Sequence, residues 1–321
     1  MKKLLPAVLL AFGMLTCGGA SGQAFPAKPI RIMVPFPPGG ATDIFARQIA
    51  QKLTESWGQQ VVVENKAGAS GTIGSDQVAK SAPDGYALLL TATHHSINPA
   101  LLAKLPYDTL RDFSNVALIA TSPNVLLLHP SVPANTVQEL IAYVKAKPGG
   151  LHYASSSAGG ATHLTAELFK TAAGINLIHV PYKGAAPAMT DLLGGQVTMM
   201  FDVLSTSMPH VRAGKLKALG VSSSKRSAIA PDVPTIAESG LPGFEAMSWF
   251  GLYAPAGVPK DIVSKLNAEV VRILQLADVK EKLAQQGAEP GAMNAAEFDA
   301  FLRTEMVKWA KAVKDSGAKA D

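Results

Sequence analysis

Residues 35–43 read Pro-Phe-Pro-Pro-Gly-Gly-Ala-Thr-Asp and connect an apolar run over residues 30–34 to an amphipathic stretch over residues 43–53. Gly-Gly-Ala-Thr occurs again at residues 159–162, between another strand-like run and another helix-like stretch. A repeated tetrapeptide alone is close to an even chance in a chain rich in Gly and Ala. The shared context is more informative, because it predicts two domains that each present a helix N-terminus.

Short apolar runs alternate with helical patterns along almost the whole chain. We expect strands at residues 30–34, 61–64, 86–91, 116–120, 125–129, 151–154, 178–180, 197–201 and 216–221. Continuous apolar strands separated by helices are typical of a mainly parallel sheet that is covered on both faces. The sequence therefore predicts an α/β fold. Thr136 with Glu139, and Asn294 with Glu297, have the spacing of helix capping boxes.

Two Pro-containing stretches without helical periodicity are candidate connections between domains: residues 120–124 and residues 241–250. If both connect domains, residues 25–121 plus 247–321 form domain 1. Residues 122–246 then form domain 2. Two such connections make a hinge.

The first residues have the pattern of an export signal. Two lysines at positions 2 and 3 precede a mostly apolar run over residues 4–15, and small residues lead to Ala24. We expect residues 1–24 to be a signal peptide, cleaved after Ala24. We therefore expect the protein in the periplasm, with no membrane-spanning segment after cleavage.

Cys17 is the only cysteine and lies inside this predicted signal. Lipid anchoring at Cys17 is not expected, because the residue before it, Thr16, fits a lipidation motif poorly. The mature chain then has no disulfide, thiolate metal site or cysteine nucleophile. Cleavage removes two lysines and no acid, which lowers the net charge from +5 to +3. This mild charge, with no nucleic-acid motif, gives no reason to expect a nucleic-acid partner.

The two Gly-rich turns have two interpretations. Each could be a tight strand-to-helix turn with a capping side chain, Thr42 or Asp43 in the first. Each could instead bind an anion, because a helix N-terminus presents free N–H groups and glycine allows close approach. The candidate ligand-binding residues are Pro38, Gly39, Gly40, Ala41, Thr42 and Asp43 in the first turn, and Ser155, Ser157, Gly159, Thr162 and His163 in the second.

Catalytic and metal-binding patterns are absent from the sequence. It contains no GxSxG, HExxH or P-loop motif, and His163 has no obvious acidic partner. His94 and His95 are a poor metal pair, because adjacent strand positions point to opposite faces. We expect no catalytic residues, no metal and no cofactor, so that an exported hydrolase is disfavoured. Asp202 follows a predicted strand, where it could contact a ligand or cap the next segment.

An ordered series of motifs runs from about residue 26 to residue 317. The motifs are Lys28-Pro-Ile-Arg31, Val34-Pro-Phe-Pro-Pro-Gly-Gly40 with Asp43, Val62-Val-Glu-Asn-Lys66, Ala82-Pro-Asp-Gly-Tyr86, Asn98-Pro99, Leu105-Pro-Tyr-Asp108, His163-Leu164, Val180-Pro-Tyr-Lys-Gly184, Pro187-Ala188, Thr190-Asp-Leu-Leu-Gly-Gly-Gln-Val197, Asp232-Val-Pro-Thr235 and Ala254-Pro-Ala-Gly257. The series resembles the Bug family (Bordetella uptake gene proteins), extracytoplasmic solute-binding components associated with tripartite tricarboxylate transporters.

The resemblance implies a periplasmic-binding-protein-like fold, with two mainly parallel-sheet α/β domains joined by a two-crossover hinge. It implies a receptor that captures a small carboxylate between the domains and delivers it to membrane transporter subunits. The turns around residues 38–43 and 155–163 would hold the carboxylate. Ser96 and Asn98 would line the cleft, and Asp202 would face the distal part of the ligand.

The second turn departs from the family pattern, in which Ser-x-Gly-x-Gly is followed by Ser or Thr. Here Ser157 replaces a glycine and Gly160 replaces the hydroxyl residue. An alternative function with the same fold is a sensory receptor that presents its closed form to a membrane signalling protein. The sequence does not separate transport from sensing, because the discriminating partner is another chain.

Overall fold

The computed structural model describes residues 25–319 apart from 148, 183 and 292. The predicted signal peptide and Cys17 lie outside these residues. The strands are β1 (Ile30–Val34), β2 (Val61–Asn65), β3 (Ala87–Ala92), β4 (Phe113–Leu128), β5 (His152–Ser155), β6 (Ile178–Pro181), β7 (Met199–Val203), β8 (Lys217–Val221), β9 (Met247–Pro255) and β10 (Glu289–Pro290). The helices are α1 (Ala41–Trp57), η1 (Ala69–Gly71), α2 (Thr72–Ala79), α3 (His94–Leu101), α4 (Val137–Ala146), α5 (Ala161–Ala173), α6 (Ala185–Leu193), α7 (Leu204–Arg212), α8 (Lys260–Leu274), α9 (Ala277–Gln285) and α10 (Ala295–Ser316).

The strands form one curled sheet in the order β2-β1-β3-β9-β4-β7-β5-β6, with β8 and β10 also paired to β4. The α/β class is confirmed. β1 runs parallel to β2 and β3, and β5 runs parallel to β6 and β7. β4 and β9 are antiparallel to each other and to their other neighbours, so the sheet is mixed where a mainly parallel one was expected.

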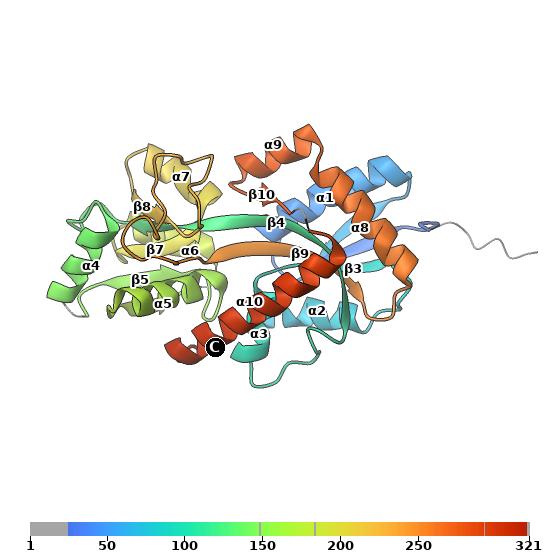
Figure 1. The fold of residues 1–321 in the computed structure, drawn as a ribbon, viewed down its shortest axis with the longest axis horizontal. Helices are drawn as coiled ribbons and strands as arrows, with labels where there is room; N and C mark the ends of the chain where they lie inside the picture. The colour runs from blue at the N-terminus through green and yellow to red at the C-terminus, as the bar shows by residue number, and fades with distance from the viewer. Residues whose placement is uncertain (1–24, 148, 183, 292, 320–321) are drawn as a thin grey trace, which may run out of the picture.

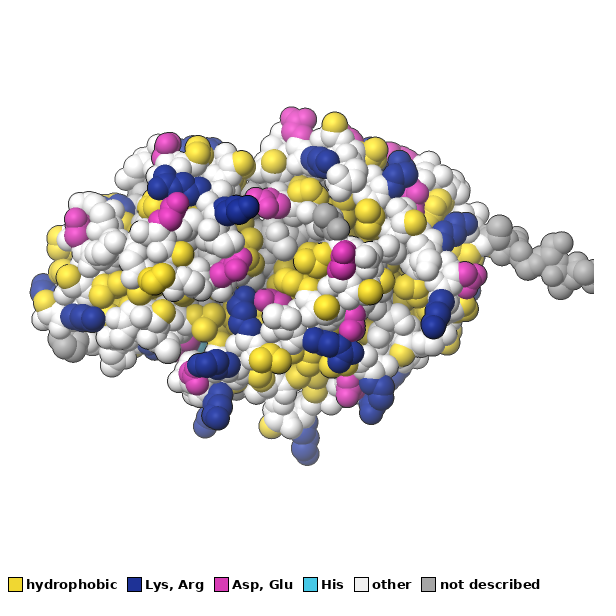
Figure 2. Space-filling view, viewed as in Figure 1, with side chains coloured by type: hydrophobic (Ala, Val, Ile, Leu, Met, Phe, Trp, Pro, Cys, Tyr) yellow, Lys and Arg dark blue, Asp and Glu magenta, His cyan; other side chains and the backbone are white. Residues whose placement is uncertain are grey.

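The two long strands connect two groups of elements (Figure 1). The first half comprises β1, β2 and β3 with α1, α2, α8 and α9. The second half comprises β5 to β8 with α4 to α7. In the space-filling view the outline is notched between the two halves, and basic and acidic side chains are interspersed on this face (Figure 2).

The predicted connection at residues 120–124 lies inside β4, which runs unbroken over 16 residues. Its first part pairs with β9 as far as Pro123, which lies opposite Met247. From Asn124 onward β4 pairs with β7. The chain therefore crosses between the halves within extended strands, and the expectation of two separate strands there was wrong.

Helix α10 packs against both halves. Near its start, Phe298 and Leu302 lie in an apolar cluster with Trp249 of β9. Further along, Trp309 lies in the cluster that includes Phe169 of α5. The helix starts with the predicted capping box, in which Asn294 and Glu297 each accept a backbone N–H of the other. The C-terminal helix therefore connects the two halves, as β4 and β9 do.

The capping box predicted near α4 forms only in part. Thr136 Oγ1 accepts the N–H of Glu139 at 3.1 Å. The Glu139 carboxylate accepts the N–H of Asn135 at 2.7 Å, one residue before the predicted partner. One unpaired N–H group at the start of the helix therefore has the expected partner. The bond expected from the glutamate to the N-cap residue forms one residue earlier.

The packing of helix α1 explains why residues 41–57 are helical and how the first Gly-rich turn is positioned. Phe45, Ile49 and Leu53 recur at helical spacing and are almost fully buried. They pack in one cluster with Ile32 and Val34 of β1. Each such side chain contributes about 2 kcal/mol by leaving water. This packing fixes the helix N-terminus at the carboxyl end of β1.

Candidate functional site

The first Gly-rich turn is held by its own aspartate. Gly39 has φ +84°, a conformation that favours glycine, and donates its N–H to Asp43 Oδ2 at 2.9 Å. Gly40 is extended and starts α1 without a side-chain cap from the described residues. The turn therefore leaves the first N–H groups of α1 unpaired within the helix.

Asp43 is buried and also accepts hydrogen bonds from Arg47 Nε at 3.0 Å and Asn65 Nδ2 at 2.9 Å. Burial alone would raise the pKa of Asp43, but these bonds and the Gly39 N–H outweigh it and lower the pKa. The carboxylate thus stays ionised and bound to its own turn. It links β2 and α1 behind the helix N-terminus.

The second turn has the same geometry with a different side chain. Gly159 has φ +68° and donates its N–H to His163 Nδ1 at 2.8 Å. Gly160 is extended like Gly40, and no described side chain caps α5. Because Nδ1 accepts a hydrogen bond, the proton of neutral His163 lies on Nε2.

His163 is buried against a second imidazole. Its ring stacks on His179 with 3.8 Å between centroids, and His179 Nε2 lies 2.7 Å from Ser155 Oγ. Burial, with the nearby His179 and Lys170, lowers the pKa of His163 to about 3. The second turn is therefore held by a neutral side chain at neutral pH. The first is held by a charged one.

A cavity of about 150 Å³ lies between the two turns. It is lined by the N-terminal residues of both helices and by the ends of β3, β7 and β9: Phe36, Ala41, Thr42, Ala92, Thr93, His94, Ser156, Ala161, Thr162, Val203, Ser248 and Phe250. Both helix N-termini carry partial positive charge. Two of them on one small cavity make a site suited to an anion.

The expected site residues fall into three groups. Ala41, Thr42 and Thr162 line the cavity. The turns that support it contain Pro38, Gly39, Gly40, Asp43, Ser155, Ser157, Gly159 and His163. The remaining three residues are buried outside the cavity wall: Ser96 and Asn98 lie in α3, and Asp202 lies in β7.

These three side chains bond to neighbouring protein groups. Ser96 Oγ donates to Thr93 O at 2.8 Å, and Asn98 Nδ2 donates to Ser70 O at 3.0 Å. Asp202 Oδ2 accepts from Thr206 and Ser207 at the start of α7, and burial raises the pKa of its carboxyl. In this conformation Asp202 neither lines the cavity nor caps α7, because its carboxylate bonds to the side-chain hydroxyls of that helix.

Sequence reasoning did not identify several lining residues. Thr93 and His94 follow β3, where the strand-end rule that selected Asp202 would also have found them. Ser248 and Phe250 belong to β9, which was expected to be a connection. The sequence signal for β9 was weak. A short apolar run that contains Gly251 shows neither the two-residue period of a strand nor the 3.6-residue period of a helix clearly.

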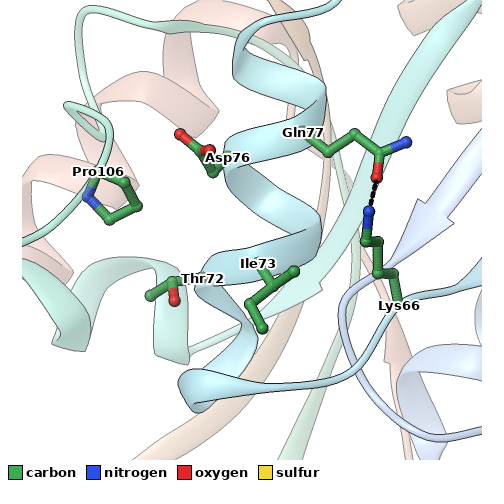
Figure 3. Close-up of a pocket in the computed structure, with 6 residues that line it drawn as sticks. All are labelled: Lys66, Thr72, Ile73, Asp76, Gln77 and Pro106. Atoms are coloured by element: carbon green, nitrogen blue, oxygen red, sulfur yellow. Dashed lines mark hydrogen bonds between the residues drawn. The ribbon is translucent and has the colours of Figure 1, made fainter.

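A second hollow, of about 420 Å³, lies beside α2. Figure 3 shows Lys66 and Gln77 on one side of the helix and Asp76 and Pro106 on the other. Lys66 Nζ donates to Gln77 Oε1 at 2.5 Å, and Asp76 adds a carboxylate that would repel an anion. Its lining residues all lie within residues 66–106. The cavity shared by both turns is therefore the better candidate site.

The described residues show neither a membrane-spanning helix nor a metal-binding cluster. None of their helices combines the length and the apolar character needed to cross a bilayer. Among the same residues, no three His, Cys, Asp or Glu side chains group as metal ligands would.

Comparison with known proteins gives consistent matches over nearly the whole chain. The family model of the tripartite tricarboxylate transporter family receptor matches residues 45–318. Protein BugT of Bordetella pertussis is 41% identical over 301 residues, covering 93% of this chain and 92% of BugT.

Two solved structures of Rhodopseudomonas palustris proteins are also similar. Rpa4515, solved with adipate, superposes with a TM-score of 0.85 at 38% identity, covering 92% of this chain and all of that one. MatC, solved with bound malate, gives 0.80 at 35% identity, covering 90% of this chain and all of MatC. The mixed α/β fold is thus that of periplasmic solute-binding proteins.

Proposed function

The chain belongs to the tripartite tricarboxylate transporter receptor family, which includes the Bug proteins, and we propose that it captures a small carboxylate outside the cytoplasmic membrane and delivers it to a membrane transporter. The observation that carries this proposal is the cavity between the N-termini of α1 and α5. Each half of the molecule contributes one of these helices. A ligand that bridges them would favour the closed arrangement.

The chemistry of the cavity supports a carboxylate. Free N–H groups at two helix starts can donate to both oxygens of one carboxylate, and the hydroxyls of Thr42 and Thr162 stand beside them. Adipate and malate, the ligands of the two Rhodopseudomonas proteins, are both carboxylates. We propose that Ala41, Thr42 and Thr162 contact the ligand directly. In this proposal Asp43 and His163 hold the turns in place.

The crossover strands support a two-domain closure. We propose that residues 25–121 plus 247–321 form one domain and residues 122–246 the other. The hinge would then lie where β4 leaves β9, near Pro123 and Met247. Asn124 lies at the same crossing and accepts a bond from Ser248 Oγ at 3.1 Å. Opening around this point would separate the two helix N-termini and release the ligand.

The cellular role follows from the family. We propose that residues 1–24 direct export to the periplasm and that the mature receptor binds membrane transporter subunits rather than nucleic acid. The interspersed charges in Figure 2 show no extended basic stripe on that face. A binding role without catalysis fits the candidate site, because the residues that line it include no carboxylate to orient an imidazole as a general base.

Thermal-shift screening of the mature chain tests ligand capture. The panel should contain mono-, di- and tricarboxylates, acidic amino acids and aromatic acids, each with its neutral amide. A ligand at 100 times its dissociation constant stabilises the fold by about 2.7 kcal/mol. We expect at least one carboxylate, and not its amide, to raise the melting temperature. Stabilisation only by neutral compounds would contradict the proposal.

A second experiment separates transport from sensing. The gene is deleted and uptake of the radiolabelled carboxylate identified by the screen is measured in whole cells. We expect uptake to fall strongly and to return when the gene is restored. Unchanged uptake, together with a lost transcriptional response to the same carboxylate, would instead support the sensory receptor.

A further inference from the structure

Two polar side chains, His94 after β3 and Ser157 after β5, converge on Gly160 at the start of α5. A Cβ atom added to Gly160 would lie closer than 3.0 Å to Ser157 Oγ and 3.4 Å from His94 Nε2. Ser157 belongs to the second turn itself. His94 follows β3 and reaches this point from the other side of the cavity. The bare α-carbon of Gly160 therefore leaves room for both groups.

His94 has a polar edge that its protein neighbours do not use. Its ring packs against Phe36 with 5.0 Å between centroids and lines the cavity. Neither ring nitrogen has a hydrogen-bond partner within the part of the chain that the structure describes, and Nδ1 is buried. Nε2 is not among the buried unpaired atoms, so it is the ring nitrogen that can donate its N–H to a ligand oxygen in the cavity.

Ser157 explains the unusual order of residues in the second turn. Its hydroxyl occupies the space that a side chain at position 160 would need. The hydroxyl has no hydrogen-bond partner among the described residues, although the Ser157 carbonyl accepts from Ser155 Oγ at 2.9 Å. Ser157 and Gly160 are thus coupled, because the serine hydroxyl fits only where residue 160 has no side chain. Together they present a hydroxyl at the N-terminus of α5.

We propose that His94 Nε2 and Ser157 Oγ form a donor pair that binds an oxygen of the carboxylate ligand at the N-terminus of α5. This inference rests on the proposed function and names two residues that determine its specificity. Because His94 follows β3 and Ser157 follows β5, strands of different halves, the pair is complete only when the halves are closed. It favours a ligand with an accepting oxygen at this position and disfavours an ammonium or methyl group there.

Isothermal titration of the mature protein with succinate, malate and adipate tests the donor pair. The variants are His94→Leu, Ser157→Ala and the double variant, and the controls are the exposed His152→Leu and Ser131→Ala. We expect each single change to weaken binding of the best probe about tenfold, since one hydrogen bond to a charged group is lost. We expect His94→Gln, which keeps a donor, to retain more affinity than His94→Leu.

The double variant reports whether the two groups act on the same ligand atom. We expect its loss of affinity to differ from the product of the two single losses, because partners of one oxygen are coupled. Both control variants should bind like the wild type.

The outcomes distinguish this inference from the function on which it rests. If the wild type binds a probe and both single variants bind it equally well, the donor pair is wrong and the receptor function stands. If the wild type binds none of the three probes, the titrations use the best carboxylate of the thermal-shift panel, and if no carboxylate of that panel binds, both fail. Melting curves without ligand show whether His94→Leu is folded. If it is unfolded, the affinities of His94→Gln and Ser157→Ala are compared with that of the wild type instead.

Discussion

Gly159 donates its backbone N–H to Nδ1 of His163 at 2.8 Å, four residues further along the chain. Gly39 makes the same bond to Asp43 in the first turn at 2.9 Å. The two turns thus share one backbone design, in which a left-handed glycine is tied to the first turn of the following helix. They differ in charge, because the tie is a carboxylate in one turn and a neutral imidazole in the other.

Replacing His163 with Ala should lower the free energy of unfolding by about 2 kcal/mol, because it removes this bond and leaves a gap in the core. Urea denaturation at pH 7.5 measures the change. His210→Ala, at a half-buried position on α7, is the control and should change stability by less than about 0.5 kcal/mol. Equal effects of the two changes would show that His163 is not a specific brace.

The same histidine predicts acid sensitivity. The pKa of His163 is lowered to about 3 in the folded protein, mainly by burial, whereas an unfolded histidine has a pKa of about 6.5. Between these values the unfolded chain binds more protons, so stability falls as the pH falls through this window. One such group contributes a slope of at most about 1.4 kcal/mol per pH unit. His163→Asn should reduce the slope measured between pH 6.5 and pH 4.5, and an unchanged slope would contradict the assignment.

Gly40→Val should keep the fold and abolish stabilisation by carboxylates. Gly40 has a negative φ, and a Cβ there would meet only Pro37 O, at 3.9 Å, so the fold has room for a side chain. The added methyl groups would instead stand over the N–H groups that a ligand needs. Gly194→Val, at an exposed glycine of negative φ after α6, is the matched control. Wild-type affinity in folded Gly40→Val would remove the first turn from the site.

Gly160→Ala should weaken ligand binding, and Ser157→Gly in the same chain should restore part of it. The alanine Cβ would collide with Ser157 Oγ, and removal of that hydroxyl frees the space. Titration of the single and double variants with the best carboxylate measures the recovery. Additive losses, with no recovery, would show that the two positions are not coupled.

Asn124→Ala should destabilise the crossing between the halves by about 2 kcal/mol. The side chain is fully buried, donates to Thr165 Oγ1 at 3.2 Å and accepts from Ser248 at 3.1 Å. Asn115→Ala changes the same residue type on the same strand, where its amide bonds to Asp299 at 3.1 Å. Thermal denaturation should show the larger loss for Asn124→Ala. A larger loss for Asn115→Ala would show that Asn124 does not make the main stabilising contact at the crossing between the halves.

The local elements were largely predictable because their signals are local. Strand β1 and the helix from Ala41 follow from apolar periodicity and from the glycines between them. Strand β9 was not predictable in this way, since residues Trp249 to Tyr253 are apolar on both faces and show no alternation of apolar and polar residues. The crossing at Pro123 was read as a loop, because proline is rare within strands. It is accommodated at the place where β4 changes partners.

The two turns of the candidate site were predictable from the local sequence, whereas the tertiary contacts between them were not. The placement of Thr42 and Thr162 on one cavity agrees with the pairing expected of the two turns. The approach of His94 to Gly160 depends on how the halves meet, and no spacing in the sequence reports that. For the same reason, the stacking of His163 on His179 joins residues that share no motif.

A crystal structure of the mature protein with a bound carboxylate tests the central claim most directly. We predict that the carboxylate oxygens lie within hydrogen-bond distance of backbone N–H groups from both turns, residues 38–43 and 155–163. A ligand held by one turn alone, or seated in the hollow beside α2 at Lys66 and Asp76, would contradict the account.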